Sequence, residues 1–171
     1  MRNRLTLAPL VAAALLATAL PATPAAGAAT RPCSAAGLVV WAGEEPGGGA
    51  AGSVYYRIEF TNLSNSTCTL AGFPKVSAVD LRGKRIGAVA KRAPGKKAKA
   101  VKLTRGQTAT AQLQIVDALN YSPGECKPTW AAGLRIGVPG GGGGKVAPLA
   151  FQTCALASAK TLAVGAVTAT D

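Results

Sequence analysis

The chain has 171 residues, with 19 lysines and arginines against seven aspartates and glutamates, no histidine and a formal net charge of +12. Without histidine the chain lacks the commonest general base and metal ligand, which excludes Ser-His-Asp and Cys-His catalytic arrangements. We therefore expect a protein that is not an enzyme and that needs no metal or cofactor.

Residues 1–28 have the pattern of a secretory signal peptide. Arg2 and Arg4 precede an apolar run that is shorter than the roughly 20 residues of a membrane span. Small residues follow, and Ala26-Gly27-Ala28 fits a cleavage site. We expect residues 29–171 to form a single secreted domain, extracellular or cell-wall associated, with no transmembrane segment after cleavage.

Four cysteines follow the predicted signal peptide. An even number in an exported chain predicts two disulfides, and no two of these cysteines have the C-x-x-C spacing of a zinc site. Three pairings are possible. The strand pattern favours Cys33–Cys68 and Cys126–Cys154, because each pair then flanks one predicted hairpin. By loop entropy each crosslink stabilises the fold by about 3–4 kcal/mol.

Short apolar or alternating runs, separated by Gly, Pro, Asn and Ser, predict strands along the rest of the chain. In chain order a loop is predicted at Pro46–Gly49 within the segment Glu44–Gly52, a basic loop at Pro94–Ala100, and a hairpin with a flexible tip at the five glycines Gly140–Gly144. The predicted strands are Leu38–Trp41, Ser53–Thr61, Val76–Leu81, Ile86–Ala90, Val101–Leu103, Thr108–Val116, Leu134–Val138, Val146–Gln152 and Leu162–Val167.

Short strands with regular turns predict an all-β fold, an antiparallel β-sandwich that is immunoglobulin-like in outline and carries two disulfides. Tyr56, Ile58 and Phe60 share one face of their strand and are assigned to the core. Trp41 and Trp130 are also assigned to the core or to packing against the disulfides, with sugar stacking as the alternative.

A set of short motifs between Cys33 and Cys154 goes beyond the general strand pattern. The most specific is Cys68-Thr69-Leu70-Ala71-Gly72-Phe73-Pro74, after Phe60-Thr61-Asn62 and before Asp80-Leu81-Arg82-Gly83 and Leu103-Thr104-Arg105-Gly106-Gln107-Thr108-Ala109. With these motifs, most of residues 33–168 resemble a family of actinobacterial secreted proteins, the domain of unknown function family 4232. The resemblance implies an extracellular or cell-wall-associated β-sandwich without known catalytic residues or an established ligand.

The acidic residues are few and scattered, and we expect each to be a solvated surface group. By number alone, a carboxylate pair of the glycosidase kind stays an alternative. The seven acids are Glu44, Glu45, Glu59, Asp80, Asp117, Glu125 and Asp171.

The basic residues, by contrast, are concentrated between Arg82 and Arg105, a stretch without any acid that we call the basic segment. Such clustering creates a positive field that concentrates anions, although a merely solvated face is the alternative interpretation. No aromatic residue interleaves with it, so specific recognition of single-stranded nucleic acid is not expected. The candidate polyanion-binding residues are Arg82, Lys84, Arg85, Lys91, Arg92, Lys96, Lys97, Lys99, Lys102 and Arg105.

These patterns predict a non-catalytic extracellular module that attaches through the basic segment to anionic cell-envelope polymers. The alternative is a protein–protein interaction module, an inhibitor or envelope-complex subunit whose partner is another extracellular protein. It would use a sheet edge or a disulfide-anchored loop, with Glu44–Gly52 and Pro139–Lys145 as candidates.

Overall fold

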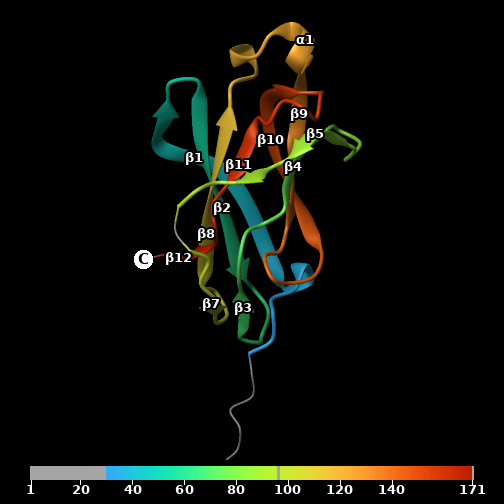
Figure 1. The fold of residues 1–171 in the computed structure, drawn as a ribbon. Helices are drawn as coiled ribbons and strands as arrows, with labels where there is room; N and C mark the ends of the chain where they lie inside the picture. The colour runs from blue at the N-terminus through green and yellow to red at the C-terminus, as the bar shows by residue number, and fades with distance from the viewer. Residues whose placement is uncertain (1–29, 96, 171) are drawn as a thin grey trace, which may run out of the picture.

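In the computed structural model, which describes residues 30–95 and 97–170, the strands form two facing sheets (Figure 1). Buried and exposed residues alternate along the long strands, so each sheet turns one face to the other. The predicted signal peptide lies outside the described residues. The elements in chain order are η1 (Ala35–Gly37), β1 (Leu38–Ala50), β2 (Ser53–Asn62), β3 (Cys68–Leu70), β4 (Val76–Val79), β5 (Arg85–Val89), β6 (Lys91–Arg92), β7 (Val101–Leu103), β8 (Thr108–Val116), η2 (Ala118–Asn120), α1 (Pro123–Cys126), β9 (Pro128–Gly137), β10 (Gly144–Cys154), β11 (Leu162–Val164) and β12 (Thr168–Ala169).

The predicted all-β sandwich is confirmed. One sheet has the strand order β1-β2-β8-β11-β6, with β12 following β11 along the same side of β8, and the other has the order β10-β9-β4-β5. The short pair β3-β7 closes one end of the molecule (Figure 1). The pairing differs from the prediction at one place, because β6 runs parallel to β11.

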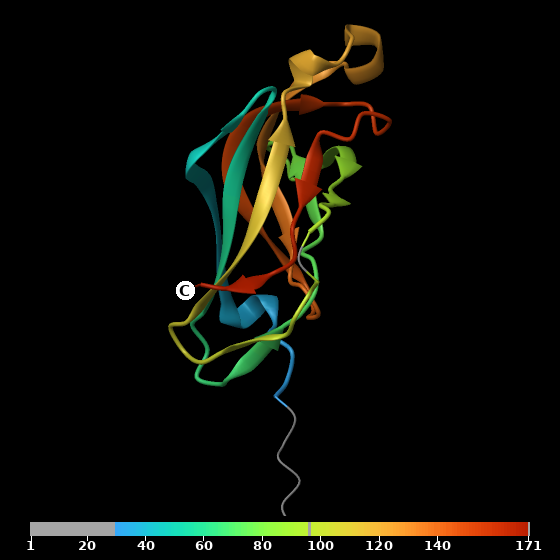
Figure 2. The same ribbon diagram turned by 60° about the vertical axis from the view of Figure 1, so that its left-hand side comes forward.

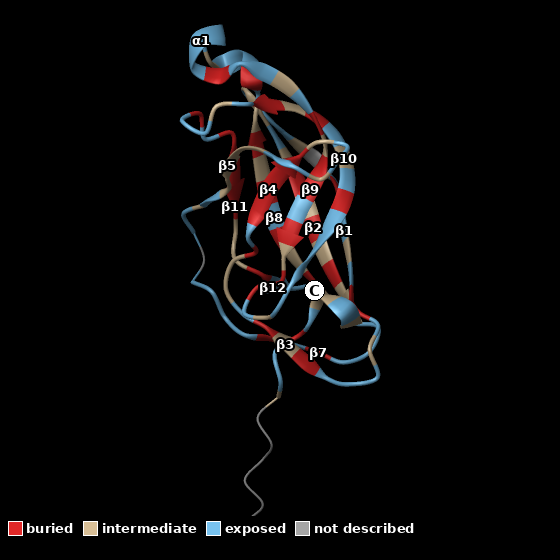
Figure 3. Cartoon of the chain, turned by 90° about the vertical axis from the view of Figure 1, so that its right-hand side faces the viewer, coloured by how far each residue is buried: buried red, intermediate tan, exposed pale blue. Residues whose placement is uncertain are grey.

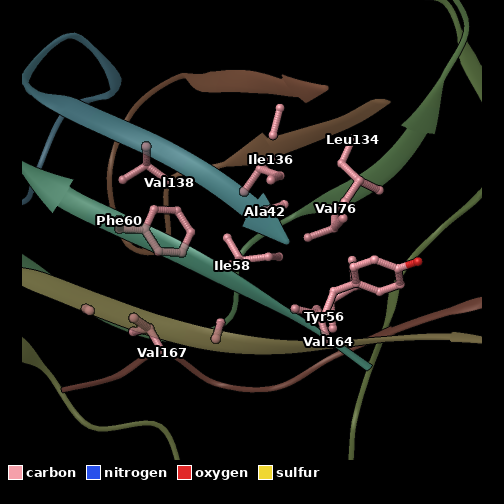
Figure 4. Packing of buried hydrophobic residues seen from close by; sticks show 14 of the residues in the cluster. Ala42, Tyr56, Ile58, Phe60, Val76, Leu134, Ile136, Val138, Val164 and Val167 are labelled. Carbon is pink, nitrogen blue, oxygen red and sulfur yellow. The ribbon is translucent and has the colours of Figure 1, made fainter. Parts of the chain in front are cut away.

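The core lies between the sheets and is built from the alternating residues that the sequence indicated. Tyr56, Ile58 and Phe60 of β2 are buried, and Phe60 and Ile58 are fully inaccessible. They lie in one hydrophobic cluster with Leu134 and Ile136 of the second sheet (Figure 4). Full burial of each such side chain contributes about 1.5–3 kcal/mol, so this cluster is the main source of stability.

The two disulfides connect the predicted pairs and lie at opposite ends of the sandwich. Cys33–Cys68 joins the start of the domain to β3, and Cys126–Cys154 joins α1 to the end of β10 (Figure 1). The first bond belongs to the main core. The second belongs to a small separate cluster with Ala118 and Ala159.

Two predicted loops are more ordered than expected. The prediction of a loop within Glu44–Gly52 is wrong, because β1 continues to Ala50. The extra residues of β1 are accommodated by a register shift against β2 between Glu44 and Gly49. The glycine tip of the β9–β10 hairpin is held by hydrogen bonds at its backbone. The amide of Ala35 donates to the carbonyl of Gly142 over 3.1 Å, so the tip packs against the start of the domain.

None of the helices in the described part of the chain has the length and apolar character of a membrane span.

Candidate functional site

The basic segment forms one long edge of the sandwich. It begins in the turn after β4, continues through β5 and β6, and ends beyond β7. Because β5 is the outermost strand of one sheet and β6 that of the other, the chain crosses between the sheets at this edge. Figure 2 shows the green and yellow-green chain descending along this side from β5 to the end that holds β3 and β7. The nine described bases of the segment therefore line one side of the molecule rather than a single pocket.

Every described basic residue of this segment is exposed, and Lys96 lies outside the described residues. Figure 3 colours the connection from β6 to β7 almost entirely as exposed. The only ion pair found within residues 30–95 and 97–170 joins Arg57 to Glu59, so no described base of the segment is neutralised by an acid. Its positive charges therefore face solvent, where a large anion can reach them.

Two contacts position the chain along this edge. The carboxylate of Asp80 accepts hydrogen bonds from the backbone amides of Arg82 and Lys84, at 2.9 and 2.8 Å, and so fixes the turn between β4 and β5. Farther along, the guanidinium of Arg92 lies 5.1 Å from the centre of the Phe73 ring, within the range of a cation–π contact. The edge therefore has a defined course despite its high charge.

Two hollows lie beside the loop that follows β6. One, of about 420 Å³, is lined by Glu45, Arg57 and Gln112 on the outer face of the first sheet and by residues 93–95 of the loop. The other, of about 570 Å³, lies between Lys97–Lys102 and Val167–Ala169 and has lysines at its rim and mostly apolar walls. The sequence patterns did not predict the wall formed by residues 167–169. The last predicted strand ended at Val167, and only the alternation Thr168-Ala169-Thr170 indicated that an extended segment continues.

The tryptophan assignment is wrong, since Trp41 is 52% exposed and Trp130 is 65% exposed. Trp41 lies on the outer face of β1, and its ring covers Gly43, where a β-carbon would overlap it. In β9 the buried positions change phase: Ala131 and Gly133 are buried, and then Leu134 and Ile136. This shift places Trp130 outside the core.

Trp130 separates two shallow hollows at the end of the sandwich that carries the Cys126–Cys154 disulfide. One, of about 440 Å³, reaches Val54 and Tyr56. The other, of about 480 Å³, reaches Leu81, which is 95% exposed. The aromatic surface is thus available to solvent, as the sugar-stacking alternative requires.

The described carboxylates each have a local structural partner. Asp117 accepts a hydrogen bond from the amide of Leu119, and Glu125 forms a capping box with Ser122. Glu45 accepts from the side chain of Gln112 at 3.0 Å. Glu59 pairs with Arg57, and Asp80 holds its turn.

The remaining carboxylate, Glu44, acts on Tyr56. Burial raises the pKa of the Tyr56 hydroxyl, and the negative charge of Glu44 and the hydrogen bond between the two groups raise it further. This pair lies in register across β1 and β2, where it supports the hairpin.

The two loops proposed for a protein partner do not form one surface. The turn after Ala50 lies at the α1 end of the molecule, whereas the glycine tip lies beside η1 at the other end (Figure 1). The tip is also occupied, because the carbonyl of Pro139 accepts a hydrogen bond from the amide of Ala71 over 3.2 Å.

A family model described as a domain of unknown function (DUF4232) matches residues 33–170. The chain belongs to this family. No match was found among curated proteins or among solved structures.

In the most specific motif of this DUF4232 domain, Cys68–Pro74, alternate residues have structural roles. Cys68 forms a disulfide, and Leu70 is fully buried in the core. Gly72 has a φ of +97°, which favours glycine, and its carbonyl accepts a hydrogen bond from Val167. The motif thus explains how the chain closes this end of the fold.

Proposed function

We propose that this domain is a non-catalytic extracellular module that attaches to anionic cell-envelope polymers through the basic segment. The single observation that carries this role is the continuous basic edge: its described charges are exposed, unpaired with acids and aligned along one side of the sandwich. Charges arranged in this way attract a flexible polyanion by long-range attraction and by release of its counterions, without a shaped pocket.

Two further features support the non-catalytic part of the proposal. The chain has no histidine, and the described carboxylates are engaged in turns, caps, side-chain hydrogen bonds or an ion pair. Two disulfides are typical of proteins that work in an oxidising environment, which supports an extracellular location.

The test is binding of the purified protein to isolated cell walls across a salt series. In one variant Lys96, Lys97, Lys99 and Lys102 are changed to Gln. The matched control changes four exposed lysines outside the segment, Lys75, Lys127, Lys145 and Lys160, so both variants lose the same charge. We expect wild-type binding to weaken steeply with salt, the first variant to lose about tenfold or more, and the control to stay within about twofold.

Walls stripped of their phosphodiester-linked polymers identify the anion, and we expect them to bind no protein. Equal losses in the two variants would show that only net charge matters and would contradict a binding edge. If no form binds at physiological salt, the bases serve to keep the exposed edge strands β5 and β6 from pairing with other chains, a known role of edge lysines.

A further inference from the structure

A groove separates two extended segments near the C-terminal end of the described chain. The hollow between Lys97–Lys102 and Val167–Ala169 continues into a smaller one, of about 290 Å³, that extends to Leu103 and Thr170. The two hollows share Val101, Lys102 and Ala169, so they form one groove with β7 on one wall and β12 on the other. Figures 1 and 2 both show β12 lying alongside this part of the chain.

The backbone of Lys102 faces this groove. Lys102 lies opposite Thr69 in the antiparallel pair β3-β7. Thr69 uses both of its backbone groups on the other side of β3: its amide donates to Arg31, and its carbonyl accepts from Cys33, each over 2.9 Å. Opposed residues in an antiparallel ladder either bond each other with both groups or with neither. The amide and carbonyl of Lys102 therefore point away from β3, to the groove side.

The backbone of Ala169 faces the same groove from the opposite wall. On β8 the even-numbered residues bond toward β11 and β12, because Gln112 accepts from Gly165, and Val116 donates to Thr161. Thr110, opposite Thr168, is therefore the bonded partner of β12. Ala169 is the next residue along and turns its amide and carbonyl away from β8.

The groove thus lies between the edges of two strands that are not hydrogen-bonded to each other. β7 pairs with β3 and β12 pairs with β8, and no backbone hydrogen bond joins β7 to β12 within the described residues. Edges of this kind accept an additional strand, whose main chain supplies the hydrogen bonds that the edge lacks. An acyl chain in the groove would leave these backbone groups unsatisfied, and that penalty favours a peptide over a lipid.

The lysines at the rim of the groove favour a negatively charged peptide. Lys97, Lys99 and Lys102 line the groove, whereas its walls include Val101 and Val167. Side chains of an extended segment alternate between two sides, so acidic residues would meet the lysines while alternate apolar residues enter the groove. We infer that the groove between β7 and β12 binds an extended acidic peptide segment of another protein by strand addition.

This site goes beyond the attachment of polyanions, although the two share three lysines, so the test must separate backbone pairing from charge. The probe is a fluorescein-labelled seven-residue peptide in which aspartate and valine alternate. Its control carries N-methyl groups on alternate amides, which remove hydrogen-bond donors and leave every charge in place. Fluorescence anisotropy at physiological salt is expected to show at least about tenfold weaker binding of the methylated peptide.

A protein variant makes the same distinction from the other side. Ala169→Pro removes the amide that faces the groove and leaves the bonded pair Thr168–Thr110 intact, a change that edge strands tolerate. Ala169→Val is the control because it keeps the amide. We expect about tenfold weaker peptide binding for the proline variant, wild-type affinity for the valine variant, and unchanged cell-wall binding for both.

Hydrogen exchange tests the same site on the wild-type protein and does not depend on whether a variant folds. The amides of Lys102 and Ala169 are expected to exchange more slowly when the acidic peptide is bound. Equal affinity for the methylated peptide, or peptide binding without protection of these amides, would overturn strand addition and leave polyanion attachment standing. Peptide binding with protection, together with no wall binding, would support the groove and reject the attachment role.

Discussion

The side-chain Nδ2 of Asn62, at the end of β2, lies 3.0 Å from the carbonyl oxygen of Leu103 in β7. The same amide donates to the carbonyl of Ser66 over 2.9 Å, and its oxygen accepts from the backbone and hydroxyl of Ser64. Asn62 is fully buried, so one side chain connects the turn after β2 to the last residue of β7, in the groove wall.

Asn62→Ala should lower the free energy of unfolding by about 3 kcal/mol, because it removes a fully buried side chain together with its hydrogen bonds to Ser64, Ser66 and Leu103. Asn65→Ala, at an exposed position of the same turn, should change it by less than about 0.5 kcal/mol. Urea denaturation measures both. Similar effects for the two variants would show that the Asn62 network does not support the fold.

The aromatic residues should divide by burial rather than by size. Phe60→Ala removes a fully buried ring and should cost about 4 kcal/mol, whereas Trp130→Ala removes a largely exposed ring and should cost less than about 1 kcal/mol. Because both tryptophans of the chain are exposed, their fluorescence should change little on unfolding. A strong shift of their emission to longer wavelengths on denaturation would contradict this placement.

The disulfides should differ in what their loss disturbs. They close loops with sequence separations of 35 and 28 residues, so each should contribute about 3–4 kcal/mol. Replacing Cys33 and Cys68 by Ser should lower the stability of the whole sandwich, because this bond lies in the main core. Replacing Cys126 and Cys154 should lower the stability by a similar amount and, in addition, speed hydrogen exchange most around η2 and α1, whose cluster is separate. Uniform loss of protection in the second variant would contradict the division.

Neighbouring glycines of the hairpin tip give a matched pair. A β-carbon on Gly141 would overlap the carbonyl oxygen of Cys33, whereas one on Gly142 would meet no atom within 4 Å. Gly141→Ala should therefore lower the melting temperature, and Gly142→Ala should leave it near the wild-type value. Equal tolerance of both substitutions would mean that the tip does not pack against the start of the domain.

Tyr56 should make the free energy of unfolding depend on pH in the alkaline range. Its pKa in the folded protein is raised above the ordinary value of 10.0, so its contribution is fully present below pH 10.0 and is lost as the pH rises through the folded pKa. Unfolding free energies measured on both sides of pH 10 should decline less steeply for Tyr56→Phe than for the wild type. Equal slopes for the two proteins would contradict this role of Tyr56.

Local patterns predicted the parts of this fold whose physical cause is local. The period of two in Ser53–Thr61 and Thr108–Val116 identified the buried faces of β2 and β8, because a strand with one buried face must alternate. The disulfide pairing followed from the two hairpins, since antiparallel strands bring the residues that flank them together. The basic segment was also apparent, because charge is a property of composition.

What only the tertiary structure decided depends on contacts between distant residues. The phase change at Gly133 that exposes Trp130 arises in β9, where strands from three parts of the chain pair side by side. The place of the basic segment at the edge of both sheets, and the groove between β7 and β12, depend on the order of strands within the sheets. Strand order is set by which apolar faces pack together across the core, and no single strand carries that information in its own sequence.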